Sequence, residues 1–495
     1  MADLIADLRQ LRVGGDYWGK QPVLPERPYT LVKVSDPESA GSYASDDPKL
    51  FWTNGSDPWH VVASAKSVVV DADDELALIA AIAGVPLVTV GEGRFSGLPG
   101  GGEPALASAV GRYVVDAWAY VNPYTEEQID ARAAVRLCGF WRNLVDSNRD
   151  ISAAFGFAFW KRPTVAPLLW AGEDVPFASE VKHTPDGEVA VWKSRTPPHV
   201  IEALEREDAR LIEVEDGFIR STGLGSDCVP PLSIVVDRQG VHFDANRPSD
   251  LEDLLQNGSF DDEMLGRARD LREMIVASGV SKYGSGSAQL LRRVEGRRHV
   301  LVPGQVEDDR AVLNSGSPVT GNLDLLKRVR EEVPGAYIIY KPHPDVEAGH
   351  RVGSIPESEC VKFADEVVRD QPISALIDLA DEIHVNTSLA GFEALLRSKA
   401  VTTHGVPFYA GWGLTRDLGP VPNRRTAKRS LDELVAAVLL LYPRYLDPVT
   451  GLPCPPEVLV HRIAEGAGTQ QGGAVVHLRR LQGRWKKRLA GLGSR

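Results

Sequence analysis

The first part of the chain alternates short β-branched runs with an apolar helical stretch. Residues 67–71 (Ser-Val-Val-Val-Asp) and 87–90 (Leu-Val-Thr-Val) are typical of strands, and residues 76–83 have apolar positions at helical spacing. A strand, a helix and a strand in this order predict a βαβ unit with a parallel sheet. Residues 1–60 are rich in Pro, Gly, Ser and Asp, so we expect little regular structure there besides a strand at 29–34.

The same alternation continues downstream in two sets. Strands of the first set are expected at 164–170, 189–192, 210–214 and 232–236, with helices at 199–207 and 248–255. Strands of the second set are expected at 299–302, 336–340, 382–385 and 400–403, with helices at 321–333, 373–379 and 391–397. Strands that alternate with helices predict parallel sheets, which bind ligands at the carboxyl ends of their strands. We therefore expect two successive α/β halves with a cleft between them.

These patterns divide the chain into five parts. They are an N-terminal α/β segment at 1–150, a first half at 151–295, a second half at 296–420, return helices at 421–465, and a linker with a tail at 466–495.

One weak internal repeat links the N-terminal segment to the second half. Residues 65–90 and 380–404 both read as strand, helix and strand, but the earlier copy lacks the polar residues that follow the strand at 382–385. Segment 1–150 is then either a decayed half-module without chemistry or an unrelated βαβ unit. Both interpretations stay open at this point.

The composition excludes several classes of function. The chain has 495 residues, 43% of them hydrophobic, and its 55 Lys plus Arg against 68 Asp plus Glu give a net charge of −13. That balance argues against a general nucleic-acid binder, which needs a basic face. Four scattered cysteines indicate neither a zinc site nor a disulfide framework, which fits a reducing cytoplasm. The acidic start indicates no signal peptide, and no apolar stretch reaches the roughly 20 residues of a membrane span.

Two motifs place ionisable groups at expected strand ends. Residues 213–221 (Glu-Val-Glu-Asp-Gly-Phe-Ile-Arg-Ser) deliver the adjacent carboxylates Glu215 and Asp216, suited to a general base or a nucleophile, with Arg220 following to pair with a substrate carboxylate. Lys341 and His343 follow the strand at 336–340, where a cation would stabilise a departing phosphate. The alternatives are a solvated acidic turn and a structural histidine.

Two further motifs carry groups that can cap a helix or hydrogen-bond a nucleotide. Thr387 and Ser388 stand where helix-capping residues belong, which is also an anion site, and Glu393 lies about one turn further, in reach of a ribose. Gln305, after the strand at 299–302, can hydrogen-bond a nucleotide, and Asp308 or Asp309 is a candidate cap for the next helix. A plain polar loop is the alternative for this last motif, which matches neither a dinucleotide fingerprint nor a Walker sequence.

Taken in order, these motifs resemble those of bacterial CMP-sugar transferases with two Rossmann-like domains. The similarity is specific to the family of capsule-polysaccharide β-Kdo transferases, the capsule polysaccharide biosynthesis proteins, because six motifs occur in sequence within residues 150–460. They lie at 215–221, 223–225, 231–233, 302–309, 340–344 and 408–413. The resemblance implies an α/β fold of the GT-B-like type, with two Rossmann-like parallel-sheet domains facing a cleft.

The resemblance also implies an activity. It is the transfer of Kdo from CMP-β-Kdo with retention, onto a lipid-linked, phosphatidylglycerol-type acceptor, by a cytoplasmic protein peripheral to the inner face of the bacterial inner membrane. Asp216 would be the catalytic carboxylate, with Glu215 second, since retention fits a double displacement. Family chains often carry two complete catalytic modules, whereas this chain has one set of motifs, so a single linkage is the expectation.

The donor-binding residues carried over from the resemblance are Arg220 for the Kdo carboxylate, Lys341 and His343 for the phosphate, assisted by Thr387 and Ser388, and Gln305 and Glu393 for the nucleoside. No cofactor is expected, and the activity should be metal-independent because basic residues would neutralise the leaving phosphate. Three alternatives remain open: another CMP-activated acid sugar, a CDP-polyol, or a non-catalytic scaffold in capsule assembly.

The last residues suggest membrane contact. Residues 475–495 carry seven Lys or Arg and no acid, with apolar residues and Trp485 at helical spacing. A basic amphipathic helix of this kind is typical of binding to an anionic membrane surface. Packing on the protein's own acidic surface is the alternative.

Overall fold

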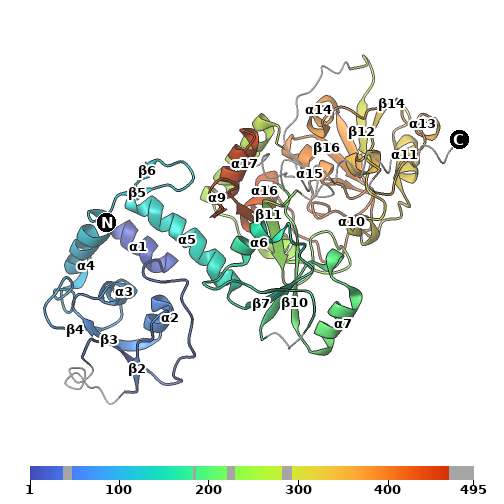
Figure 1. Cartoon of the computed structure of the whole chain (residues 1–495). Helices are drawn as coiled ribbons and strands as arrows, with labels where there is room; N and C mark the ends of the chain where they lie inside the picture. Colours follow the sequence, from blue (N-terminus) through green and yellow to red (C-terminus); the bar gives the residue numbers. More distant parts are fainter. Residues whose placement is uncertain (37–46, 182–185, 220–228, 281–292, 350, 468–495) are drawn as a thin grey trace. The chain divides into compact units, whose positions relative to one another are not determined.

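The computed structural model describes residues 1–36, 47–181, 186–219, 229–280, 293–349 and 351–467 (Figure 1). The chain forms two compact units. Unit 1 comprises Met1–Asp150 with Leu169–Asp174, and unit 2 comprises Ile151–Leu168 with Val175–Arg495. No helix in the described ranges is both long and apolar enough to cross a membrane.

Unit 1 is built on a four-stranded parallel sheet in the order β2-β1-β3-β4. Its strands are β1 (Tyr29–Lys33), β2 (Lys49–Phe51), β3 (Ala65–Asp71) and β4 (Leu87–Val90). Its helices are α1 (Ala2–Leu11), α2 (Pro58–Ala63), α3 (Leu76–Ala83) and α4 (Gly102–Val110), the last continuing into the π-helical turn η2 (Gly111–Val115). A two-stranded hairpin, β5 (Tyr120–Val121) with β6 (Gln128–Ile129), leads into α5 (Ala131–Asn148). The predicted βαβ unit is confirmed by β3, α3 and β4.

The first sheet of unit 2 has seven strands in the order β19-β18-β11-β10-β9-β7-β8. They are β7 (Ile151–Phe155), β8 (Phe177–Ala178), β9 (Glu188–Val191), β10 (Arg210–Asp216), β11 (Ser233–Asp237), β18 (Pro443–Leu446) and β19 (Pro453–Cys454). The strands from β8 to β10 run parallel, and β11, β18 and β19 extend the sheet in antiparallel fashion. The helices associated with this half are α6 (Arg162–Leu169), α7 (Pro198–Arg206), α8 (Asp250–Asn257) and α9 (Asp262–Ser278).

The second sheet of unit 2 has six strands, all parallel, in the order β14-β13-β12-β15-β16-β17. They are β12 (His299–Pro303), β13 (Tyr337–Lys341), β14 (Glu366–Val367), β15 (Glu382–Val385), β16 (Ala400–Thr403) and β17 (Arg416–Asp417). Its helices are α10 (Arg310–Leu313), α11 (Asn322–Glu332), α12 (Pro344–Glu347), α13 (Glu357–Cys360), α14 (Ile373–Leu379) and α15 (Leu389–Leu396). The chain then returns through α16 (Leu431–Val435), the π-helical turn η5 (Ala436–Leu441) and, after β18 and β19, α17 (Pro456–Ala464).

One expected strand is wrong. Residues 164–170 lie in and just after helix α6, although Thr164, Val165 and the two leucines suggested a strand. Val165, Leu168 and Leu169 are fully buried, and their spacing of three and four residues places them on one helical face. A short apolar run is compatible with both a strand and a helix, and here burial of one helical face favours the helix.

The second sheet has a topological switch point at its centre. From β12 the chain moves outwards to β13 and β14, then returns to β15 on the other side of β12 and continues to β16 and β17. Open parallel sheets form their ligand crevice where the strand order reverses, at the carboxyl ends of the two central strands. In this sheet that place is the end of β12 and β15, which positions residues 304–305 and 386–388.

Candidate active site

The adjacent carboxylates Glu215 and Asp216 are the last two residues of β10. Because side chains alternate along a strand, Glu215 shares a face with Glu213, and Asp216 points to the other face. Gly217 follows at a close approach to β11: its amide donates to the Ser233 carbonyl at 3.0 Å, and a Cβ there would lie 2.2 Å from Ser233 Oγ. The chain therefore turns at this position without room for a side chain.

Asp216 lies beside a buried lysine, Lys161, that directly precedes α6. Lys161 Nζ is 3.3 Å from Asp216 Oδ1 and 3.1 Å from the centroid of the Trp192 ring. The lysine is 5% exposed, whereas the Asp216 side chain keeps 27% of its surface exposed. The ion pair places a cation behind the one carboxylate of this pair that is more open to a ligand.

Glu215 meets a different cation, contributed by the second half. Arg310 at the start of α10 reaches Glu215 Oε1 with Nη1 at 2.8 Å and Glu213 Oε1 with Nη2 at 2.5 Å. Burial, followed by the adjacent Asp216 charge, raises the pKa of Glu215 to about 8, while Arg310 acts in the opposite direction. Two neighbouring acids thus have different electrostatic surroundings, which suits them to different chemical tasks.

The switch point of the second sheet is bridged by a reciprocal pair of hydrogen bonds. Gln305 Nε2 donates to Thr387 Oγ1 at 2.9 Å, and the Thr387 amide donates to Gln305 Oε1 at 2.9 Å. The Gln305 amide in turn donates to Asn322 Oδ1 at 2.8 Å. A small cavity opens beside this bridge and is lined by Gln305, Glu307, Asn322 and Asn386, among others. Two motifs that lie 82 residues apart in sequence therefore form one polar surface.

Lys341 is the last residue of the neighbouring strand β13, and His343 lies two residues further along. Lys341 is buried and its Nζ donates to the Arg369 carbonyl at 2.8 Å; burial lowers the pKa of Lys341. His343 is the N-cap of α12, and its Nδ1 accepts from the Asp345 amide at 3.1 Å. That bond assigns the proton of the neutral imidazole to Nε2. The Gly304 amide donates to the Lys341 carbonyl at 2.8 Å, so this motif adjoins the Gln305 turn.

The third motif lies at the start of α15. Ser388 caps this helix, because its Oγ accepts from the Ala390 amide at 3.2 Å, and Tyr409 donates to the Ser388 carbonyl. The capping interpretation of Ser388 is therefore confirmed, as is the cap that Asp309 provides for α10. Glu393 is buried further along α15.

An aromatic cluster joins the acidic motif to the motif at 408–413. The Phe218 ring lies 4.8 Å from that of Phe408, between centroids, and 6.3 Å from those of Phe392 and Tyr442. Apolar packing thus connects the residue after the Glu-Asp-Gly turn to the second half. Arg220, two residues further along, lies outside the described residues, as does the basic tail at 475–495.

The structure adds three charged residues that sequence reasoning missed: Lys161, Arg310 and Glu213. The alternation of Glu213 and Glu215 was a visible signal that both acids share one strand face. Lys161 carried no such signal, since it precedes a segment interpreted as a strand. Arg310 directly follows the motif at 302–309, and its partner Glu215 lies 95 residues earlier in the chain.

Comparisons with known proteins place this architecture. The family model "Capsule polysaccharide biosynthesis protein" matches residues 187–445. The chain is 40% identical over 342 residues to the capsule polysaccharide modification protein LipA of Neisseria meningitidis serogroup A, covering 67% of this chain and 48% of LipA. It is 46% identical over 239 residues to the lipopolysaccharide-processing protein LpsZ of Rhizobium meliloti, covering 48% of this chain and 54% of LpsZ. The chain therefore spans about half the length of the curated relatives it matches.

Two solved structures match more completely. The Thermosulfurimonas dismutans KpsC beta Kdo 2,4 transferase is 32% identical with a TM-score of 0.55, and the beta Kdo 2,7 transferase from the same protein is 36% identical with a TM-score of 0.51. Each alignment covers 63% of this chain and 98% of the other. These matches confirm the expected α/β, GT-B-like fold. On the family model and these relatives, the chain belongs to the capsule polysaccharide biosynthesis protein family.

Proposed function

We propose that this protein is a retaining β-Kdo transferase that uses CMP-β-Kdo in the synthesis of a capsular polysaccharide linker. The observation that carries the proposal is the pair of adjacent carboxylates at the end of β10, with Asp216 beside Lys161 and Glu215 held in a buried site with a raised pKa. Membership of the capsule polysaccharide biosynthesis family and similarity to two Kdo transferases support the choice of sugar.

Asp216 acts as the nucleophile in this proposal. Its ionised carboxylate attacks the anomeric carbon of Kdo, the bond from that carbon to the phosphate oxygen breaks, and CMP leaves with the electron pair. The acceptor hydroxyl then attacks the same carbon, breaks the bond to Asp216 and restores the original configuration. The 27% exposure of the Asp216 side chain and the cation behind it favour this residue over Glu215.

Glu215 acts as the acid and base. A carboxyl group whose pKa is about 8 holds a proton at neutral pH, and this proton stabilises the departing phosphate oxygen. The resulting carboxylate then takes the proton from the acceptor hydroxyl in the second displacement. Arg310 is a positioning residue, because it holds Glu215 and Glu213 from the opposite half.

The nucleotide binds at the switch point of the second sheet. His343 Nε2–H and Lys341 stabilise the phosphate, Thr387 and the capped start of α15 at Ser388 assist, and Gln305 and Glu393 contact the nucleoside. Charge on the leaving phosphate is then neutralised by side chains, so activity is expected to be metal-independent. Arg220, outside the described residues, is assigned to the Kdo carboxylate.

The acceptor is proposed to be a lipid-linked saccharide of the phosphatidylglycerol type at the cytoplasmic face of the inner membrane. The basic, Trp-containing sequence of residues 475–495 supports binding to an anionic surface. A chain that ends at Gly473 should bind anionic vesicles more weakly and turn over a soluble acceptor normally. Equal vesicle binding by both chains would contradict this assignment.

A donor-comparison assay tests the function directly. The purified protein is given a Kdo-terminated acceptor and either CMP-Kdo generated in situ, CMP-sialic acid or a CDP-polyol, with and without EDTA, and products are identified by mass spectrometry and NMR. The proposal expects one added Kdo with β configuration, undiminished by EDTA and lost in Asp216→Ala. Transfer from another donor, or none from any, would overturn it.

A further inference from the structure

The sheet of unit 1 has the topology of the central four strands of the second sheet of unit 2. The order β2-β1-β3-β4 corresponds to β13-β12-β15-β16, with every pair parallel and the same switch point at the centre. Pairing also gives a matching row across three strands: Val32 pairs with Phe51 and Val69 in unit 1, as Val300 pairs with Ile338 and Glu382 in unit 2. Both rows have the same hydrogen-bond parity, since the Trp52 amide donates to the Val32 carbonyl as the Tyr337 amide donates to the Arg298 carbonyl.

The correspondence continues beyond the sheets. In unit 1, α4 runs into the π-helical turn η2, then into the hairpin β5–β6 and α5; in unit 2, α16 runs into the π-helical turn η5, then into β18–β19 and α17. The hairpin registers match residue for residue, since Tyr120 pairs with Ile129 and Tyr445 pairs with Cys454. Two π-helical turns at corresponding places are a specific likeness, because this element is rare.

The two hairpin turns are the same at the level of single hydrogen bonds. The side chains of Asn122 and Asp447 each accept from the backbone amide two residues ahead, at 2.9 and 3.2 Å. Their carbonyls each accept from the amide four residues ahead, at Glu126 and Gly451, with distances of 2.8 and 2.9 Å. Both of these residues have positive φ, 61° and 71°, a conformation uncommon for a glutamate.

We propose that unit 1 is a second copy of the nucleotide-side half of unit 2 in which the nucleotide site has been closed, so that the chain binds one nucleotide. This inference rests on the proposed function for the identity of the ligand. It concerns how many donor sites the chain has and where the single site lies.

The end of β3 has acids where the end of β15 has hydroxyls. Counted from the shared row, Thr387 corresponds to Asp74 and Ser388 to Glu75, which is also where the following helices α15 and α3 begin. Glu75 takes the N-cap position of α3, as Ser388 does in α15, and the preceding Asp74 accepts from the Leu76 amide with Oδ1 at 2.9 Å. The helical fold is thus retained while two carboxylates replace neutral groups, and these repel a phosphate.

The end of β2 has lost the cations. Counted from the same row, Asn54 stands for Lys341 and Ser56 for His343. In unit 1 the chain passes from β2 at Phe51 to the N-cap of α2 at Asp57, without the α12, α13 and β14 insertion of unit 2.

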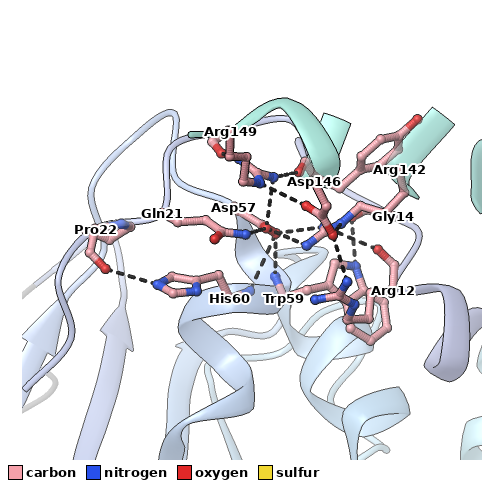
Figure 2. A network of polar contacts seen from close by, with 12 residues as sticks. Arg12, Gly14, Gln21, Pro22, Asp57, Trp59, His60, Arg142, Asp146 and Arg149 are labelled. Carbon is pink, nitrogen blue, oxygen red and sulfur yellow. Dashed lines mark hydrogen bonds and ion pairs between the residues drawn. The ribbon is translucent and has the colours of Figure 1, made fainter. Parts of the chain in front are cut away.

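Asp57 closes this end of the unit 1 sheet. Its carboxylate is fully buried and receives Arg142 Nη2 at 2.6 Å, Arg142 Nη1 at 3.1 Å and Arg149 Nη2 at 3.3 Å (Figure 2). Figure 2 shows Arg142 of α5 and Arg149, directly after this helix, pointing toward Asp57, with Gln21 on the same carboxylate. The cations at this end are committed to a carboxylate of the unit itself.

Three further polar groups at the switch point of unit 1, all among the residues that the structure describes, have partners within the unit. Lys33 Nζ lies 2.9 Å from Asp74 Oδ2, the Ser35 amide donates to Asp71 Oδ2 at 2.7 Å, and the Arg94 amide donates to Asp73 Oδ1 at 2.8 Å. A nucleotide phosphate entering here would displace ion pairs and meet three carboxylates. Unit 1 thus has the fold of a nucleotide-binding half, but its carboxylates and internal ion pairs disfavour binding of a nucleotide phosphate.

Calorimetric titration of the full chain with CMP tests the inference. We expect one CMP per chain, at least tenfold weaker binding in His343→Ala, and binding within twofold of wild type in the unit 1 variant Asp74→Asn, which keeps an oxygen acceptor for the Leu76 amide. A crystal structure with CMP should show the nucleotide at the switch point of unit 2.

Three results would overturn it: two CMP per chain, CMP found in unit 1, or single-site binding that Asp74→Asn weakens and His343→Ala does not. A wild-type chain that binds no CMP, while its fold is intact by circular dichroism, would instead overturn the proposed donor. Transfer of Kdo together with two CMP sites would leave the proposed function standing and remove this inference alone.

Discussion

Asp216 and Glu215 are neighbours on one strand, yet their side chains meet different cations. Lys161 from the segment before α6 pairs with Asp216, and Arg310 from the second half pairs with Glu215. Alternation along β10 separates the two side chains, and burial sets the second apart by raising its pKa. The proposed division of labour between nucleophile and acid follows from these surroundings.

Replacing Lys161 tests the proposed environment of Asp216. Lys161→Met keeps the length of the buried stem and removes the charge beside Asp216, so kcat should fall by about 100-fold, on the order of what one electrostatic contact to a reacting group contributes, with little change in KM. Lys193→Met, which removes an ion pair to Glu213 on the other face, is the control and should lower kcat less than threefold. Equal effects of the two changes would contradict the special role of Lys161.

The dependence of kcat on pH tests the proposed environment of Glu215. Because the pKa of Glu215 is about 8, the proton it gives to the leaving phosphate is present at neutral pH and is lost as pH rises through that value. We predict that kcat declines above about pH 8 in wild type. Glu215→Gln should have low activity and lack this decline, and a wild-type profile flat from pH 7 to 9.5 would argue against the assignment.

Single elements were predictable where the local pattern was unambiguous. The strands at 382–385 and 400–403 were predicted with their observed bounds, because β-branched runs there are bounded by polar residues and turns. The strand predicted at 164–170 was wrong because a short apolar run fits both a strand and a helix. The Gln305 to Thr387 bridge could not be predicted, since it depends on β12 and β15 being neighbours in a sheet whose order the sequence does not state.

That bridge makes an element-scale prediction. Gln305→Ala removes both hydrogen bonds that join the turn after β12 to the start of α15, so KM for CMP-Kdo should rise about tenfold, equivalent to roughly 1.4 kcal/mol, with kcat changed less. Gln305→Glu keeps the acceptor for the Thr387 amide and should lie between wild type and alanine. A fall in kcat at constant KM would contradict a role in binding.

The buried ion pairs of α5 lead to a second prediction at the scale of single elements. Arg142→Met leaves the buried Asp57 with Arg149 as its remaining cation, beside Gln21 and the first amides of α2, which should destabilise unit 1 by about 3 to 5 kcal/mol, as loss of one partner of a buried pair does. Hydrogen exchange should report the loss in unit 1 amides. Lys66→Met breaks an exposed pair with Asp47 and should cost under about 1 kcal/mol; similar losses in both variants would argue against the buried cluster as the anchor of α5.

At the scale of the whole molecule, the order of six motifs was enough to expect the family and the GT-B-like fold. The relation between the two copies was only weakly visible in sequence, because Asp74, Glu75 and Asn54 in unit 1 stand where Thr387, Ser388 and Lys341 stand in unit 2. It is carried instead by strand order, pairing register and a turn with positive φ at Glu126 and Gly451. Backbone geometry has thus been retained where side-chain chemistry has changed.

The most direct test of the account is to look for the covalent intermediate. Wild-type protein, with or without CMP-Kdo generated in situ and with no acceptor present, is quenched in acid and its intact mass and peptides are measured. The account predicts a gain of one Kdo residue on the peptide that contains Asp216, absent in Asp216→Asn and lost when acceptor is added. Efficient transfer with no adduct under any quench condition, or an adduct that persists in Asp216→Asn on another residue, would contradict it.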